Sequence, residues 1–269
     1  GWWVPEKFMA ATYVNHNHFA GYLELVIPVT IGTLLRYKKM NTFLRGVFYF
    51  GLVMMFTAFV ISQSRGGWVC LGFSLFIMLI MLYRNGQIRI TGVILIIGLV
   101  AMVIGGICVK KGEVFERIAS FGEVHKGEAS LATRFKIWEG ASGMIEERPA
   151  LGFGPGDFDW GFYRYKPRGL NVLAQFAHND YIQVAAEIGL FGVPALLWIL
   201  IRILRLGFRM SSHPVMLGCA AGILSLSLHG LIDFNFYIPA NVLLFTIYIG
   251  IISGQRKLAV SGSHGREKS

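Results

Sequence analysis

Long runs of apolar residues are the feature that most constrains how this chain folds. Hydrophobic residues make up 54% of the sequence and charged residues only 15%, with a mean hydropathy of +0.56. A bilayer has a hydrocarbon core about 30 Å thick, which a helix of roughly 20 apolar residues crosses. Only helices and closed barrels satisfy their backbone groups there. The runs are too long for barrel strands of roughly 10 residues, so the sequence predicts an all-α polytopic membrane protein.

Seven candidate membrane spans are expected. They are residues 18–35, 43–62, 66–83, 88–109, 181–201, 215–232 and 238–253. The basic residues of the short linkers, such as Arg36, Arg84 and Arg202, fall on one face, which the positive-inside rule assigns to the cytoplasm. The formal net charge of +10 is explained by these linkers, and we do not expect nucleic-acid binding. The long loop and Arg65 are then periplasmic, and the C-terminus is cytoplasmic.

These spans divide the chain into four parts. They are residues 1–109 with four spans, 110–178 as a periplasmic loop or cap, 179–254 with three spans, and 255–269 as a disordered cytoplasmic tail. The chain begins with Gly1, and no cationic segment followed by an apolar stretch marks a signal peptide. We therefore expect a C-terminal fragment of a larger protein.

The long loop is expected to carry structure of its own. Five apolar residues recur at helical spacing after the possible N-cap Ser130, and Pro149 ends the helix that they predict. They are Leu131, Phe135, Trp138, Ala141 and Ile145. The glycines of residues 152–156 indicate a turn, and an aromatic stretch follows. The sequence therefore predicts an amphipathic helix against the membrane surface, followed by a cap over a cavity.

Ionisable residues inside spans are costly, so each is treated as a functional hypothesis. The first group is Asn15-His-Asn-His18, which leads into a span that contains Glu24. A His-x-His pair can ligate a metal ion, but a metal site usually needs three or four ligands. Helix capping at the membrane interface is the favoured interpretation, and we expect neither a metal nor another cofactor.

Two arginines have placements that suit an anion. Arg65 stands at the outer end of a span before two glycines, where a guanidinium can bind phosphate with two hydrogen bonds. The alternative is an arginine that extends to lipid headgroups. Arg134 shares the apolar face of the predicted loop helix with Trp138, where it either holds an anion or stacks on the indole. The residues themselves leave both alternatives open.

Two polar stripes accompany these arginines. Asn179, Gln183 and Glu187 are spaced four residues apart, which predicts a polar face that points into the helix bundle. His178 precedes this stripe at the outer mouth of the span, where an imidazole can take a proton near neutral pH. The alternative is that Asn179 or Asp180 caps the helix while His178 hydrogen-bonds the loop.

The second stripe is Ser225, His229 and Asp233, again at intervals of four residues. On one helix these side chains would lie on one face. His229 and Asp233 could then form a structural pair rather than a catalytic one.

Taken in order, these motifs resemble the O-antigen ligase and polymerase superfamily over about residues 12–250. The motifs are Asn15-His-Asn-His-Phe-Ala-Gly21, Ser64-Arg65-Gly66, Arg134-x-x-x-Trp138, Arg148-Pro-x-Leu-Gly-x-Gly-x-Gly156-x-Phe158, Ala177-His-Asn-Asp-Tyr181, Glu187-x-Gly189, Leu190-x-Gly192 and Leu231-Ile-Asp233-Phe. Only the ordered combination is specific. The resemblance implies a larger GT-C-like bundle in the bacterial inner membrane, with its active site facing the periplasm.

The resemblance also implies an activity. Such enzymes take a glycan from undecaprenyl diphosphate and pass it to a hydroxyl of a sugar, of the lipid A-core or of a protein, without a metal. Carried over by position, Arg65 and Arg134 would hold the diphosphate, His178 would deprotonate the acceptor, and Asp233 would orient the site. Residues in possible supporting roles are Glu187, Asn179, His229 and Glu24.

Several alternatives to an O-antigen ligase remain open. Repeat-unit polymerases of O-antigen or exopolysaccharide and protein O-oligosaccharyltransferases share the same motifs. A polar-lined membrane transporter is the alternative of another class, and inverted internal repeats would favour it. The sequence contains no such repeat, and the long loop favours an enzyme.

Overall fold

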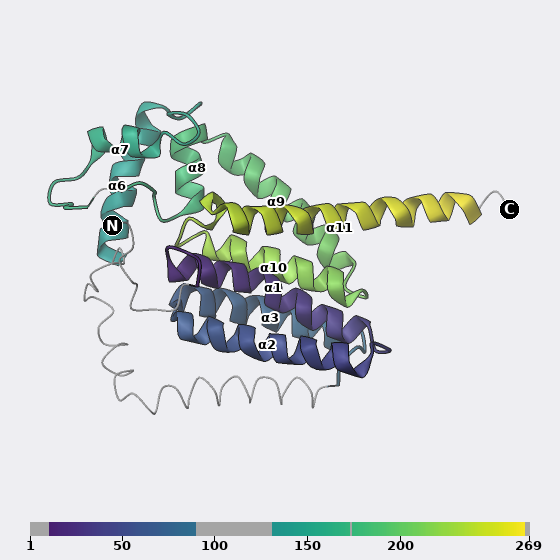
Figure 1. The fold of residues 1–269 in the computed structure, drawn as a ribbon. Coiled ribbons are helices and arrows are strands. Elements are labelled where there is room, and N and C mark those ends of the chain that lie inside the picture. The colour runs from purple at the N-terminus through teal and green to yellow at the C-terminus, as the bar shows by residue number, and fades with distance from the viewer. Residues whose placement is uncertain (1–10, 90–130, 173, 267–269) are drawn as a thin grey trace. The chain divides into compact units, whose positions relative to one another are not determined.

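The computed structural model describes residues 11–89, 131–172 and 174–266. Within these residues every regular element is a helix, with nine α-helices, one short 3-10 helix and no strand (Figure 1). The chain forms two compact units, which are described separately. Unit 1 comprises residues 1–87, 197–230 and 235–269, and unit 2 comprises residues 88–196 and 231–234. The all-helical expectation is confirmed for the described residues.

Unit 1 contains the apolar helices. They are α1 (His16–Arg36), α2 (Thr42–Ser62), α3 (Arg65–Arg84), α10 (Pro214–His229), α11 (Pro239–Arg266) and most of α9 (Gly192–Arg209), with the 3-10 helix η1 (Asn235–Tyr237) before α11. In Figure 1, α1 lies between α10 and α2, and α10 also contacts α3. α1, α2 and α3 are long and apolar enough to cross a membrane, so the spans predicted at 18–35, 43–62 and 66–83 are confirmed as such helices. Residues 90–109, nearly all of the span predicted at 88–109, lie outside the described residues.

Polar side chains fix where the first three helices begin. The side chain of Asn15 accepts a hydrogen bond from the amide of Asn17 at 2.7 Å, and Asn41 caps α2 in the same way. The hydroxyl of Ser64 accepts from the amide of Gly67 at 3.3 Å. These bonds satisfy amides of the first turn, which have no partner within the helix. The capping interpretation of the Asn15 segment is therefore confirmed.

α1 and α10 approach so closely that only glycine fits between them. A Cβ atom on Gly218 would lie 2.5 Å from the carbonyl oxygen of Pro28, and one on Gly222 would lie 3.0 Å from that of Leu25. Because lipid offers no hydrophobic driving force between helices, such close contact of small residues is a main source of helix association in membranes.

A buried carboxylate lies where α1 and α10 meet. Glu24 accepts a hydrogen bond from the hydroxyl of Ser225 at 2.7 Å, and its other oxygen is 2.7 Å from Nδ1 of His229. The side chains of Glu24 and His229 are almost fully buried. The predicted stripe of Ser225, His229 and Asp233 is therefore wrong in part. α10 ends at His229, so Asp233 leaves the helix, and His229 pairs with Glu24 instead.

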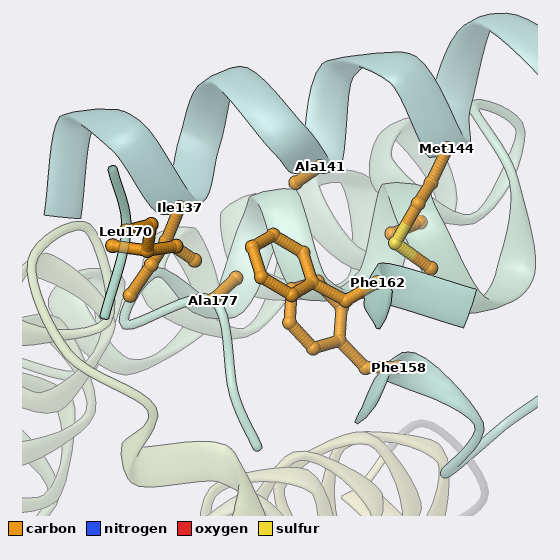
Figure 2. Close-up of a cluster of buried hydrophobic side chains, with 8 residues drawn as sticks. Ile137, Ala141, Met144, Phe158, Phe162, Leu170 and Ala177 are labelled. Carbon is orange, nitrogen blue, oxygen red and sulfur yellow. The ribbon is translucent and has the colours of Figure 1, made fainter. Parts of the chain in front are cut away.

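Unit 2 is built from α6 (Leu131–Glu147), α7 (Phe158–Tyr165), α8 (Asp180–Ile188) and the beginning of α9. Its core is shown in Figure 2 and consists of Ile137, Ala141, Met144, Phe158, Phe162, Leu170, Ala177 and Ala186. The loop helix and its end before Pro149 are confirmed, whereas Ser130 lies outside the described residues. Of the predicted apolar face, Ala141 is buried in this core and Ile145 packs against it, whereas Phe135 is 60% exposed.

The glycines of α6 explain which face is buried. A Cβ atom on Gly140 would lie 2.6 Å from the ring of Phe162, and one on Gly143 would lie 2.8 Å from the ring of Tyr165. These two positions let α7 pack closely against α6. The packed face therefore passes through Ile137, Gly140 and Met144, rather than through Phe135.

The span predicted at residues 181–201 is two helices. α8 ends at Ile188, and α9 begins at Gly192. Gly189 between them has φ +89°, and a side chain there would collide with the carbonyl of Ala150. The amide of Leu190 donates to the carbonyl of Pro149 at 2.8 Å. The continuous apolar run hid this break, because the break depends on the Pro149 segment from the loop.

The C-terminal helix is longer than the sequence suggests. The sequence predicts a span at 238–253 and a disordered tail from residue 255, whereas the backbone of α11 is helical as far as Arg266. The chain has no proline after Pro239, so every later residue has the amide that a continuing helix needs.

The close packing of α1 and α10 gives a matched pair of substitutions. We expect Gly218→Ala to destabilise unit 1 by about 1–3 kcal/mol, because the added methyl group overpacks a backbone contact. Gly250→Ala is the control, since a Cβ atom at Gly250 meets nothing within 4 Å. Replacing glycine by alanine in an open helix position is neutral or stabilises by about 0.5–1 kcal/mol. Thermal unfolding in detergent measures both, and an equal effect of the two changes would contradict the packing argument.

Candidate functional site

The candidate site lies within unit 2, where three segments of that unit meet. They are α6, the residues just before α8, and the turn at residues 231–234. The structure brings Arg134, His178 and Asp233 into this unit, together with Asn179 and Glu187. Arg65, Glu24 and His229 belong to unit 1 and are considered by themselves.

His178 and Asp233 form the central pair. Nδ1 of His178 lies 3.4 Å from Oδ1 of Asp233, with 22% of the histidine side chain and 1% of the aspartate side chain exposed. The same Asp233 oxygen accepts from the amide of Phe234 at 3.0 Å. A carboxylate at Nδ1 favours the tautomer that carries its proton there, which leaves Nε2 as the basic nitrogen. The distance is long for a hydrogen bond, as is common for catalytic groups without substrate.

The backbone of His178 has an uncommon conformation. Its φ is +50°, in the left-handed region that residues other than glycine seldom adopt. Residues held in this way occur preferentially at functional sites, because the surrounding structure must enforce the conformation.

Hydrogen bonds hold both backbone polar groups of the preceding residue, Ala177. The amide of Ala177 donates to Oε1 of Gln183 at 2.6 Å, and the indole Nε1 of Trp138 donates to the carbonyl of Ala177 at 2.8 Å. Nε2 of Gln183 donates to Glu187 at 2.7 Å, which orients the glutamine amide. We call Trp138, Gln183 and Glu187 the Ala177 clamp. The clamp fixes the backbone from which the His178 side chain projects.

Asn179 connects α8 to the turn that carries Asp233. Its Oδ1 accepts from the amides of Tyr181 and Ile182, each at 3.0 Å, and so caps α8. Its Nδ2 donates to the carbonyl of Leu231 at 2.7 Å. Capping by Asn179, one of the two alternatives, is therefore confirmed. The predicted stripe is also confirmed, because Asn179, Gln183 and Glu187 are all buried.

Aromatic rings border the pair. The rings of Phe176 and Phe234 are stacked with centroids 4.2 Å apart, and the ring of His178 meets Phe234 edge-on at 5.0 Å. Apolar surface beside an imidazole excludes water and strengthens its electrostatic interactions. The sequence motifs predicted no role for these two rings, although Phe234 ends the motif Leu231-Ile-Asp233-Phe and Phe176 directly precedes the motif that begins at Ala177.

Arg134 binds the same turn. Its Nη1 donates to the carbonyl of Ile232, the residue before Asp233. The side chain is half-buried, and its enclosed Nε has no hydrogen-bond partner within the residues that the structure describes. A buried N–H without a partner is costly, so this guanidinium is suited to a ligand that accepts hydrogen bonds. Arg134 therefore binds the carbonyl of the residue that directly precedes the catalytic candidate Asp233.

In unit 1, Arg65 is the first residue of α3 and is exposed. The turn before it is unusual, because Gln63 has φ +58°. Gly67, two residues later, lies against the buried carboxylate, since a Cβ atom there would be 2.8 Å from Oε1 of Glu24. The pair of Glu24 and His229 therefore packs against the first turn of the helix that Arg65 opens.

Among the described residues, no third metal-ligating side chain joins the histidine pair near the N-terminus. His16 and His18 are both buried at the start of α1. Across residues 11–89, 131–172 and 174–266, no group of three or more His, Cys, Asp or Glu side chains is arranged to hold a metal ion.

Comparison with known proteins agrees with this arrangement of motifs. The profile described as O-antigen ligase matches residues 50–197, which include Arg65, Arg134 and His178. This chain belongs to the O-antigen ligase family. Family membership and the apolar helices of unit 1 indicate a membrane protein. The resemblance seen in the sequence motifs is therefore confirmed.

A curated relative also matches. The chain is 31% identical over 168 residues to an uncharacterized protein of Haemophilus influenzae. The match covers 56% of this chain and 41% of that relative. The chain thus spans less than half the length of this curated relative.

The Ala177 clamp gives a test of the site's construction. We expect Gln183→Met to leave the Ala177 amide and Glu187 without their partner and to destabilise unit 2 by about 1–3 kcal/mol. Hydrogen exchange at residues 177–180 should accelerate. Gln175→Met is the matched control, because Gln175 is exposed on the same segment. If exchange were the same in the two variants, the clamp would not be what holds His178.

Proposed function

We propose that this member of the O-antigen ligase family transfers a glycan from undecaprenyl diphosphate to a hydroxyl of a sugar or of the lipid A-core at the periplasmic face of the bacterial inner membrane. The observation that carries the proposal is the pairing of His178 with the buried carboxylate of Asp233, on a backbone that the Ala177 clamp fixes. Sequence position alone gives each of these residues a role, and their contacts within unit 2 support it.

In the proposed reaction His178 is the general base. Its Nε2 takes the proton of the acceptor hydroxyl as the oxygen attacks the anomeric carbon of the glycan. The bond from that carbon to the diphosphate oxygen breaks, and the oxygen keeps the electron pair. Asp233 accepts the Nδ1 proton of His178 in a hydrogen bond and so stabilises the imidazolium that forms.

The diphosphate leaving group is stabilised by positively charged side chains. Negative charge grows on the diphosphate oxygen as the bond breaks, and a fixed guanidinium in a site of low dielectric constant favours that change. Arg134 has the free N–H capacity for this role within unit 2. The family resemblance implies the same role for Arg65. Because Arg65 belongs to unit 1, this role is proposed independently of the site in unit 2.

Four further residues have supporting roles in the proposal. Glu187 and Asn179 position His178 through the Ala177 clamp and the α8 cap. Glu24 and His229 support the first turn of α3, which Arg65 opens. None of the four needs to touch the reacting atoms.

Substitutions in the full-length protein test these roles. We expect His178→Ala to lower the rate of glycan transfer by about 100-fold or more, as loss of a general base does. Arg134→Ala and Arg65→Ala should each lower it by about 100-fold, as loss of a charge-stabilising donor does. Transfer of a labelled glycan from undecaprenyl diphosphate in isolated membranes measures the rate.

Arg164→Ala is the matched control, because Arg164 is an exposed arginine that pairs with Glu147. It should leave transfer unchanged while the protein remains present at normal levels. If the three site variants kept the transfer rate of this control, the assignment of Arg65, Arg134 and His178 would be wrong.

The lipid-linked pool of a deletion strain separates the remaining alternatives. An O-antigen ligase predicts long glycans that remain on the lipid carrier, with none on the lipid A-core. A repeat-unit polymerase predicts single units on both carrier and acceptor, and a protein O-oligosaccharyltransferase predicts unmodified target proteins with a normal lipid A-core. Gels of the surface glycan and mass spectrometry of the carrier pool measure these outcomes, and unchanged pools would favour a transporter.

A further inference from the structure

A basic groove in unit 1 has no part in the proposed transfer. Its volume is about 1070 Å³, and it is formed by the end of α1, the linker to α2, the first turns of α2, and residues 87 and 212–214. All of these residues belong to unit 1. The groove is open to the outside and combines cationic with apolar side chains, which is the chemistry of an amphiphile site.

Three cations line the groove without a carboxylate among the lining residues. They are Arg36, Lys38 and Lys39, and all three are exposed. Positive charges gathered in this way repel one another, and an anion between them relieves the repulsion. The charge pattern therefore points to an anionic ligand.

Hydrogen bonds hold the linker that carries the two lysines. The guanidinium of Arg45 donates to the carbonyls of Tyr37 and Lys38. The amide of Met40 also donates to the Tyr37 carbonyl, at 3.0 Å. The backbone of the linker is thus folded against the start of α2. The backbone that carries the two lysines is therefore in place before any ligand binds.

His213 adds a donor to the same groove. Nε of Arg36 donates to Nε2 of His213 at 3.3 Å, which requires that the proton of the neutral ring be on Nδ1. That Nδ1 is enclosed and has no hydrogen-bond partner in the described part of the chain. Burial, and secondly Arg36, lower the pKa of His213, so the ring is neutral at pH 7 and offers an N–H rather than another charge.

The rest of the groove is apolar. Met40, Leu44 and Phe48 line it from the linker and from α2. The first turns of α2 also leave Phe43 80% exposed and Val47 49% exposed. A free phosphate would use only the cations, whereas a phospholipid would use both parts, with its phosphate at the cations and an acyl chain along α2.

We propose that this groove binds an anionic phospholipid, with Arg36, Lys38 and Lys39 around the headgroup phosphate and Leu44 and Phe48 along an acyl chain. Arginine and lysine side chains near a membrane surface attract anionic lipids in this way. The binding does not depend on glycan transfer, so it can be tested apart from the proposed function.

The experiment is a titration of the purified protein in detergent with phosphatidylglycerol and, separately, with phosphatidylcholine, read by native mass spectrometry. Phosphatidylglycerol should bind more tightly than phosphatidylcholine. The double variant Lys38→Gln and Lys39→Gln should weaken phosphatidylglycerol binding by about tenfold. The matched control is Arg202→Gln with Arg205→Gln, which removes two exposed positive charges from α9 outside the groove and should change binding by less than about twofold.

Three results would overturn the proposal. Equal weakening by the two double variants would mean that only the total charge matters. Equal binding of phosphatidylglycerol and phosphatidylcholine would mean that the charge of the headgroup does not determine the affinity. Binding of glycerol 3-phosphate as tight as that of phosphatidylglycerol would assign the groove to a soluble phosphate and not to a lipid. Each result can occur whether or not the protein transfers glycans.

Discussion

The site depends first on the hydrogen bonds that fix the backbone of one residue, Ala177. Trp138 and Gln183 bind the carbonyl and the amide of Ala177, and Glu187 orients Gln183. These bonds hold the backbone that leads into His178, whose φ of +50° lies in the sparsely populated left-handed region. The His178 side chain can then meet Asp233, whose turn is bound by Asn179 and Arg134 through its carbonyls. A flexible loop could supply the same residues, but it would not hold them in one geometry.

Unit 1 shows the same principle in an apolar setting. Buried polar groups in a membrane bundle must find partners within the protein, because lipid offers none. Glu24 does so with Ser225 and His229, and the glycines of α10 allow the close approach of α1 that these bonds need. Gly67 brings the first turn of α3 against the same carboxylate. The first turn of the helix that Arg65 opens is therefore capped by Ser64 and packs against a buried polar network.

Much of the fold, and the segments that contribute to the candidate site in unit 2, could be predicted from the sequence, because both depend on local patterns. The apolar runs with Asn15, Asn41 and Ser64 before them define α1, α2 and α3, and the spacing of Asn179, Gln183 and Glu187 predicts a buried face. What could not be predicted depends on contacts between distant segments. The break at Gly189 requires the backbone of Ala150, the conformation of His178 requires Trp138 and Gln183, and the pairing of His229 with Glu24 joins opposite ends of the chain.

The central claim is that the protein breaks the bond between a glycan and undecaprenyl diphosphate. The most direct measurement is the release of free undecaprenyl diphosphate by the purified full-length protein in liposomes that contain donor and acceptor but no nucleotide. The account predicts one released carrier for each glycan that appears on the acceptor. Donor that crosses the bilayer intact, with no carrier released and no glycan on the acceptor, would contradict the account and would indicate a transporter.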